Sequence, residues 1–200
     1  MTENTDAAFA QLTSLRELSA HRDTVGMKDD VIRHFLSIDS TLATAIGEAL
    51  VRRKELSEEF GHDIMSLSES ELSPILQSDF INFYAPATVN PYVALAARGP
   101  WIITTHGAVL HDNGGYGMLG SGHGPSEVIH AMSQNWVMAN VMTPSYSHKR
   151  LADRLKTELG HTRGSCPFTR FICMNSGSES VTVSLRIADV NARKMTGPGG

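Results

Sequence analysis

Residues 169–193 read Thr-Arg-Phe-Ile-Cys-Met-Asn-Ser-Gly-Ser-Glu-Ser-Val-Thr-Val-Ser-Leu-Arg-Ile-Ala-Asp-Val-Asn-Ala-Arg. The four apolar residues 171–174 are typical of a short strand that is covered on both faces. Ser176 and Glu179 follow with the Ser-x-x-Glu spacing of a capping box, which predicts a tight turn and a helix that begins after Ser176. This strand, turn and helix decide the fold that we expect for the chain.

The segment after the turn has two periodicities. Four apolar residues alternate with polar ones, as in a strand: Val181, Val183, Leu185 and Ile187. A helical stripe through Val181 and Leu185 continues to Ala188 and Ala192. We predict a helix, because the capping box precedes the segment and because alanine favours helices.

The start of this helix is a candidate phosphate site. In a capping box the Ser176 hydroxyl accepts from the Glu179 amide, and the Glu179 carboxylate accepts from the Ser176 amide. The amides of Gly177 and Ser178 are then left without a partner within the helix. Free amides at a helix N-terminus, where the helix dipole is positive, bind phosphate groups, and Gly177 has no side chain to obstruct a ligand. The alternative is an ordinary capped helix without a ligand, and the Glu179 charge favours that alternative unless a cation compensates it.

Composition limits the functional class. The chain has 200 residues, 41% of them hydrophobic and 19% charged, which is typical of a globular protein. The net charge of −4 gives no reason to expect nucleic acid, and no apolar run is long enough to cross a membrane. Two cysteines do not make a disulfide framework, and the polar, acidic N-terminus is unlike a signal peptide. We therefore expect a soluble, cytoplasmic protein.

Residues 1–80 are predicted to form a helical N-terminal extension, because their apolar residues recur at helical spacing. Ser73 and Pro74 fit the N-cap and first position of a short helix. The extension is either a docking or dimerisation appendage or a helical layer on the next domain, and amphipathic faces favour the layer. From residue 81 onward, strand, glycine-rich and helical segments alternate, which predicts an α/β fold with a largely parallel sheet.

Four segments in this second part resemble one family. They are Gly107-Ala-Val-Leu-His-Asp-Asn-Gly114, Gly122-His-Gly-Pro-Ser-Glu-Val128, Leu151-Ala-Asp-Arg-Leu155 and Asn175-Ser-Gly-Ser-Glu179. In order and roughly in spacing they are similar to segments of the class III aminotransferases, which are fold-type I enzymes that use pyridoxal 5′-phosphate (PLP). The family patterns are Gly-x-x-Leu-x-Asp-x-Asp-Gly, Gly-His-x-His-Pro-x-Val, Leu-Ala-x-x-Leu and Asn-Ser-Gly-Ser/Thr-Glu.

The resemblance implies an aminotransferase that moves an amino group from an amine or amino acid to a keto acid. It implies PLP as cofactor, with Gly177, Ser178 and Ser176 around the phosphate, Tyr116 facing the substrate and His123 in a structural role. It also implies a homodimer. The family's Schiff-base lysine lies well downstream of the phosphate loop, and no lysine of this chain lies on a matching segment. Residues 81–200 would therefore be the N-terminal part of the transferase fold, and the catalytic residues are unknown.

Several alternatives stay open at this point. The same scaffold supports aminomutase, decarboxylase and racemase reactions. A non-catalytic helical or assembly module without PLP is a further possibility. A metal site is not expected, because the histidine pairs 106/111 and 123/130 lack the i, i+4 spacing of helix ligands and the cysteines at 166 and 173 lack close Cys-x-x-Cys spacing.

Overall fold

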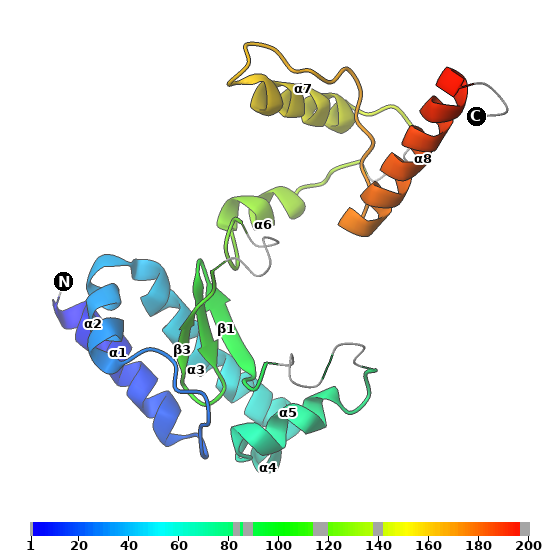
Figure 1. Ribbon diagram of the computed structural model, residues 1–200. Coiled ribbons are helices and arrows are strands. Elements are labelled where there is room, and N and C mark those ends of the chain that lie inside the picture. The colour runs from blue at the N-terminus through cyan, green and yellow to red at the C-terminus, as the bar shows by residue number, and fades with distance from the viewer. Residues whose placement is uncertain (1, 82–84, 86–89, 114–119, 138–141, 197–200) are drawn as a thin grey trace. The chain divides into compact units, whose positions relative to one another are not determined.

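The computed structural model describes residues 2–81, 85, 90–113, 120–137 and 142–196 (Figure 1). The chain forms two compact units, Met1–Gln134 and Asn135–Gly200. The boundary that the sequence places after residue 80, between a helical extension and a transferase domain, stays a prediction. Among the described residues, no helix combines the length and the hydropathy that crossing a bilayer requires.

In the described part of the first unit, helices come both before and after the strands along the chain. Its described elements are α1 Thr2–Glu17, α2 Asp29–Ile38, α3 Ser40–Phe60, α4 His62–Met65, α5 Glu69–Gln77, β1 Ala94–Arg98, β2 Trp101–Thr104, β3 Val109–His111 and α6 Ser126–Met132.

The start of α5 differs from the prediction. Ser68 and Glu71 form a capping box, in which the Glu71 carboxylate accepts a hydrogen bond from the Ser68 amide at 2.9 Å. The Ser73 hydroxyl donates instead to the carbonyl of Pro91 at 3.1 Å, and Pro74 lies inside the helix. The prediction that Ser73 and Pro74 open this helix is wrong, because an earlier Ser-x-x-Glu signal sets its beginning.

The sheet is small and antiparallel, with β2 between β1 and β3. Only Gly99 and Pro100 separate β1 from β2, whereas a parallel pair needs a crossover of about a dozen residues or more. Gly99 has a φ of +52°, which a residue without a side chain adopts at little cost. The structure is 56% helical, so the predicted α/β fold with a largely parallel, fold-type I PLP-transferase-like sheet is wrong.

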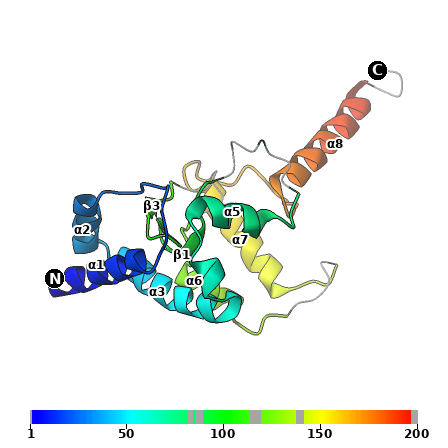
Figure 2. The same ribbon diagram turned by 90° about the horizontal axis from the view of Figure 1, so that it is seen from below.

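The core of the first unit lies between the sheet and the N-terminal helices. α3 packs on β1 and β2, and α1 lies beside α3 (Figure 1, Figure 2). The Trp101 side chain, 1% exposed, packs against the ring of Phe35 with centroids 4.9 Å apart. The buried cluster around them includes Leu12, Leu15, Ile32, Leu42, Ile46, Ile103 and Val109. The helices α1, α2 and α3 thus contribute the apolar layer that covers this sheet.

The second unit contains α7 Tyr146–Gly160 and α8 Gly177–Thr196. The Ser145 hydroxyl accepts from the amide of His148 at 3.2 Å and so caps α7. The segment with two competing periodicities forms the helix α8, so the choice of helix over strand is confirmed.

Candidate functional site

The turn before α8 has the hydrogen bonds of a capping box. The Ser176 hydroxyl accepts from the Glu179 amide at 3.2 Å. In return, the Glu179 carboxylate accepts from the amides of Ser176 at 3.1 Å and Asn175 at 3.0 Å. The predicted capping box is therefore confirmed, and it fixes where the helix begins.

The next two amides in the turn are open. Within the described part of the chain, the amides of Gly177 and Ser178 have no hydrogen-bond acceptor. A Cβ atom added to Gly177 would meet no heavy atom within 4 Å, so the backbone there is accessible. Two adjacent free amides at a helix N-terminus, with the Ser178 hydroxyl beside them, make a donor set that fits the oxygens of a phosphate group.

The negative charge of Glu179 opposes the binding of an anion to this donor set. One carboxylate oxygen, Oε2, is already shared by the amides of Asn175 and Ser176. These hydrogen bonds hold the carboxylate against the turn. The capping role accounts for an acidic residue in the first turn of α8, and the two remaining amides stay available.

The segment that leads into the turn is not a strand. Residues 171–174 are neither helix nor strand, and in the described chain they make no backbone–backbone hydrogen bond. The Ile172 side chain is 65% exposed, and Cys173 is exposed rather than part of a core. The prediction of a buried strand is wrong, because no neighbouring strand in the described chain supplies the ladder that would cover and pair it.

A second polar arrangement lies in the first unit. The His123 Nε2 atom lies 2.9 Å from Oδ2 of Asp112, and the two side chains are 22% and 17% exposed. Backbone hydrogen bonds of 2.9 and 2.8 Å join Gly99 to His123 in both directions. The sequence predicted a structural role for His123 but not its pairing with Asp112. The backbone hydrogen bonds to Gly99 fix the position of His123, and the Asp112 carboxylate orients its imidazole ring.

The glycines on either side of His123 let this loop lie close to Arg98 and Gly99. Gly122 and Gly124 have φ values of +74° and +59°. The carbonyl of Gly124 accepts from Arg98, whose guanidinium also pairs with Glu48 on α3 at 2.7 Å. The hydrogen bonds and ion pair of Arg98 thus hold this loop against β1 and α3.

The other predicted site residues are distributed as follows. Tyr116 and Gly114, the last residue of the first family-like segment, lie outside the described residues. Ser176, Gly177 and Ser178 are adjacent in the second unit, whereas Asp112 and His123 belong to the first. Among the described residues, no group of three or more His, Cys, Asp or Glu side chains is placed to hold a metal ion.

Comparison of the chain with protein-family models, curated proteins and solved structures gave no match. The functional interpretation therefore rests on the turn before α8 and on the order of the four sequence segments.

Proposed function

We propose that the protein acts as a PLP-dependent aminotransferase, which moves an amino group from an amine or amino acid to a keto acid. The observation that carries the proposal is the turn at 175–179. It has the residue order of the family's phosphate loop, and it leaves two adjacent amides without an acceptor among the described residues. The three further segments that resemble the family, in the same order, support the same assignment.

The residues of the turn have separate tasks in this proposal. The amides of Gly177 and Ser178 donate to phosphate oxygens, and the Ser178 hydroxyl supplies a third donor. Ser176 and Glu179 do not contact the phosphate through their capping atoms; their hydrogen bonds hold the two amides in place. When bound, PLP supplies an electron sink for the carbon next to the substrate's amino group.

The remaining parts of the proposal follow the resemblance. The active form is a homodimer, Tyr116 contacts the substrate, and the protein acts in the cytoplasm. The lysine that the chemistry requires is not assigned to any residue of this chain. Light scattering at micromolar concentration tests the dimer: a mass near that of two chains supports it, and a monomer contradicts it.

Equilibrium dialysis of the complete protein against PLP tests the cofactor. Saturable binding of about one PLP per chain is expected, with competition by inorganic phosphate because the turn holds the phosphate group. Product analysis with an amine donor and a keto acid then separates amino transfer from aminomutase, decarboxylase and racemase reactions. A folded protein that binds no PLP would support the alternative of a non-catalytic helical or assembly module.

A further inference from the structure

A groove in the second unit lies between α7 and residues 169–173. Its volume is about 570 Å³, within the range of small-molecule sites. Apolar lining comes from Leu151 and Leu155 on α7 and from Phe171 in the segment before α8. All residues that line it belong to Asn135–Gly200, so the groove is complete within one unit.

The groove also has a cationic part. Lys156 and Arg170 line it, and within the described chain neither of them forms an ion pair. Two other cations of α7 are paired, Lys149 with Asp153 and Arg154 with Glu158. Two unpaired cations beside an apolar surface match a ligand with an apolar body and one anionic group.

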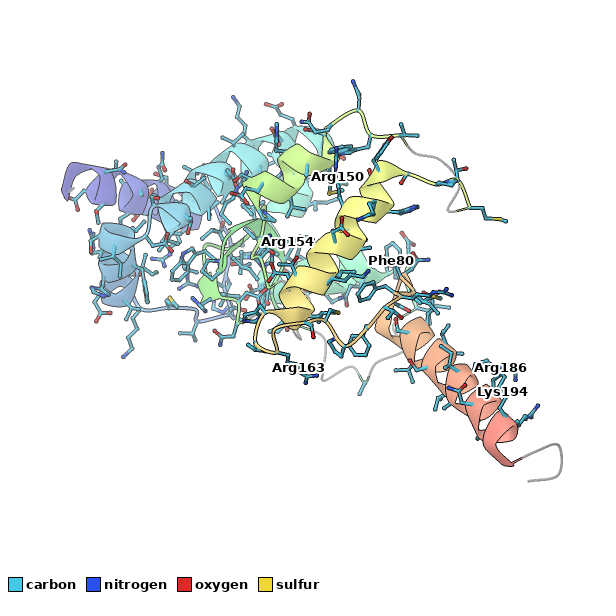
Figure 3. All side chains as sticks on the ribbon, turned by 90° about the horizontal axis from the view of Figure 1, so that it is seen from above. Phe80, Arg150, Arg154, Arg163, Arg186 and Lys194 are labelled. Carbon is cyan, nitrogen blue, oxygen red and sulfur yellow. The ribbon has the colours of Figure 1, made fainter. Side chains whose placement is uncertain are left out.

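The charge of the whole unit favours an anion as well. Residues 135–200 contain nine Lys and Arg against four Asp and Glu, which gives a net charge of +5. Figure 3 shows further cations that project from this unit: Arg150 and Arg154 on α7, Arg163 after it, and Arg186 and Lys194 on α8. A local excess of one charge raises the concentration of oppositely charged ligands.

We propose that this groove binds a small amphiphilic carboxylate, such as a medium-chain fatty acid. The hydrocarbon chain lies against Leu151, Leu155 and Phe171, and the carboxylate pairs with Lys156 and Arg170. The apolar contacts supply affinity through burial, and the two cations select an anionic head group over a neutral one. This site is separate from the free amides of Gly177 and Ser178 and does not depend on PLP.

Cys173 provides a direct readout, because it lines the groove and is exposed, whereas Cys166 does not line it. The complete protein is treated with iodoacetamide, with and without decanoate below its micelle concentration, and the alkylation of each cysteine is followed by mass spectrometry. Decanoate is expected to slow alkylation of Cys173 severalfold and to leave Cys166 nearly unchanged. Decanol, which has the same chain without the charge, should protect Cys173 much less.

Substitutions test the charge requirement. The double variant Lys156→Gln, Arg170→Gln should weaken decanoate binding by about tenfold or more, as expected for losing charged hydrogen-bond donors. Arg163→Gln, which removes one positive charge outside the groove, should change binding less than about twofold, and Arg170→Lys should retain most of it. Circular dichroism checks that each variant is folded. Equal protection by decanol and decanoate, equal weakening by Arg163→Gln, or no protection of Cys173 would overturn the proposal.

Discussion

The indole N–H of Trp101 on β2 donates to Oδ2 of Asp39 at 2.7 Å, and Oδ1 of the same carboxylate accepts from the Thr41 amide at 2.8 Å. Asp39 is the N-cap of α3, so one carboxylate both starts this helix and ties it to the sheet. Because Trp101 is almost fully buried, its N–H relies on that carboxylate for a partner.

Asp39→Ala should destabilise the protein by about 2–3 kcal/mol, because it removes a helix cap and leaves a buried indole N–H unsatisfied. Chemical denaturation followed by tryptophan fluorescence measures the change in the free energy of unfolding. Asp30→Ala, an exposed aspartate in the first turn of α2, is the matched control and should change that free energy by no more than about 0.5 kcal/mol. Equal effects of the two variants would show that the cap and the indole bond contribute little.

Asp39 also predicts a pH dependence. Partial burial raises the pKa of Asp39, but hydrogen bonds from the Thr41 hydroxyl, the Trp101 indole and the Thr41 amide outweigh it, and the pKa is lowered overall. A folded-state pKa below the unfolded one stabilises the fold above the unfolded value, and this stability is lost as the pH falls through the folded value. The free energy of unfolding should therefore decrease from about pH 5 downward, and less steeply in Asp39→Asn. Denaturation curves at a series of pH values compare the two slopes; parallel slopes would contradict the assignment.

The local parts of this structure could be predicted from the sequence. The capping box of Ser176 and Glu179 sets the start of α8, since the signal lies within four residues and outweighs the strand-like alternation after it. The same signal at Ser68 and Glu71 predicts the start of α5, although the neighbouring Pro74 is the more conspicuous residue.

The non-local parts could not be predicted in this way. The apolar residues 171–174 have the composition of a buried strand, yet burial depends on a neighbouring strand that short-range patterns do not specify. Glu69 resembles a surface acid of a first helical turn, but the chain at 23–24 folds over it and buries it completely. The pairing of Asp112 with His123 likewise depends on the bridge between Gly99 and the loop at 122–124.

Glu69 is expected to be one of the most sensitive polar positions. Its side chain is 0% exposed, and Oε2 accepts from the amides of Asp23 at 2.9 Å and Thr24 at 2.6 Å. Glu69→Ala leaves two amides without an acceptor and opens a cavity, so it should cost about 2–4 kcal/mol of unfolding free energy. Glu69→Gln keeps an acceptor oxygen and should cost less. Urea denaturation ranks the variants beside Glu58→Ala, an exposed control on α3, and a Glu69→Ala value close to that control would contradict the buried role.

A substitution of Gly122 tests whether its close contact with Gly99 holds His123 in place. Its φ is +74°, and an added Cβ would lie 2.9 Å from the Cα and carbonyl oxygen of Gly99. Gly122→Ala should destabilise the first unit by about 2–4 kcal/mol, through backbone strain and the displaced bridge. A Cβ at Gly120 would meet nothing within 4 Å, so Gly120→Ala should be nearly neutral in the same thermal unfolding experiment. Similar losses for both variants would point to a general intolerance of the loop.

The turn before α8 gives a test in which stability and ligand binding separate. Gly177→Pro removes one free amide and adds a ring beside the place of the anion, while proline is well tolerated at the first position of a helix. The helix should persist by circular dichroism, and PLP affinity in dialysis should fall about tenfold or more. Ser178→Ala keeps its amide and loses only a hydroxyl, so the affinity should fall a few-fold, or by about 1 kcal/mol.

Ser176→Ala is the matched structural variant, because the Ser176 hydroxyl caps the helix through the Glu179 amide. Its expected cost is about 1 kcal/mol of unfolding free energy. If the turn is only a capped helix, Ser176→Ala is the variant that matters, and neither Gly177→Pro nor Ser178→Ala changes any ligand affinity. If the two amides hold the phosphate, Gly177→Pro changes PLP binding much more than it changes stability, which a cap alone does not explain. Unchanged PLP affinity in Gly177→Pro would therefore place the phosphate site elsewhere.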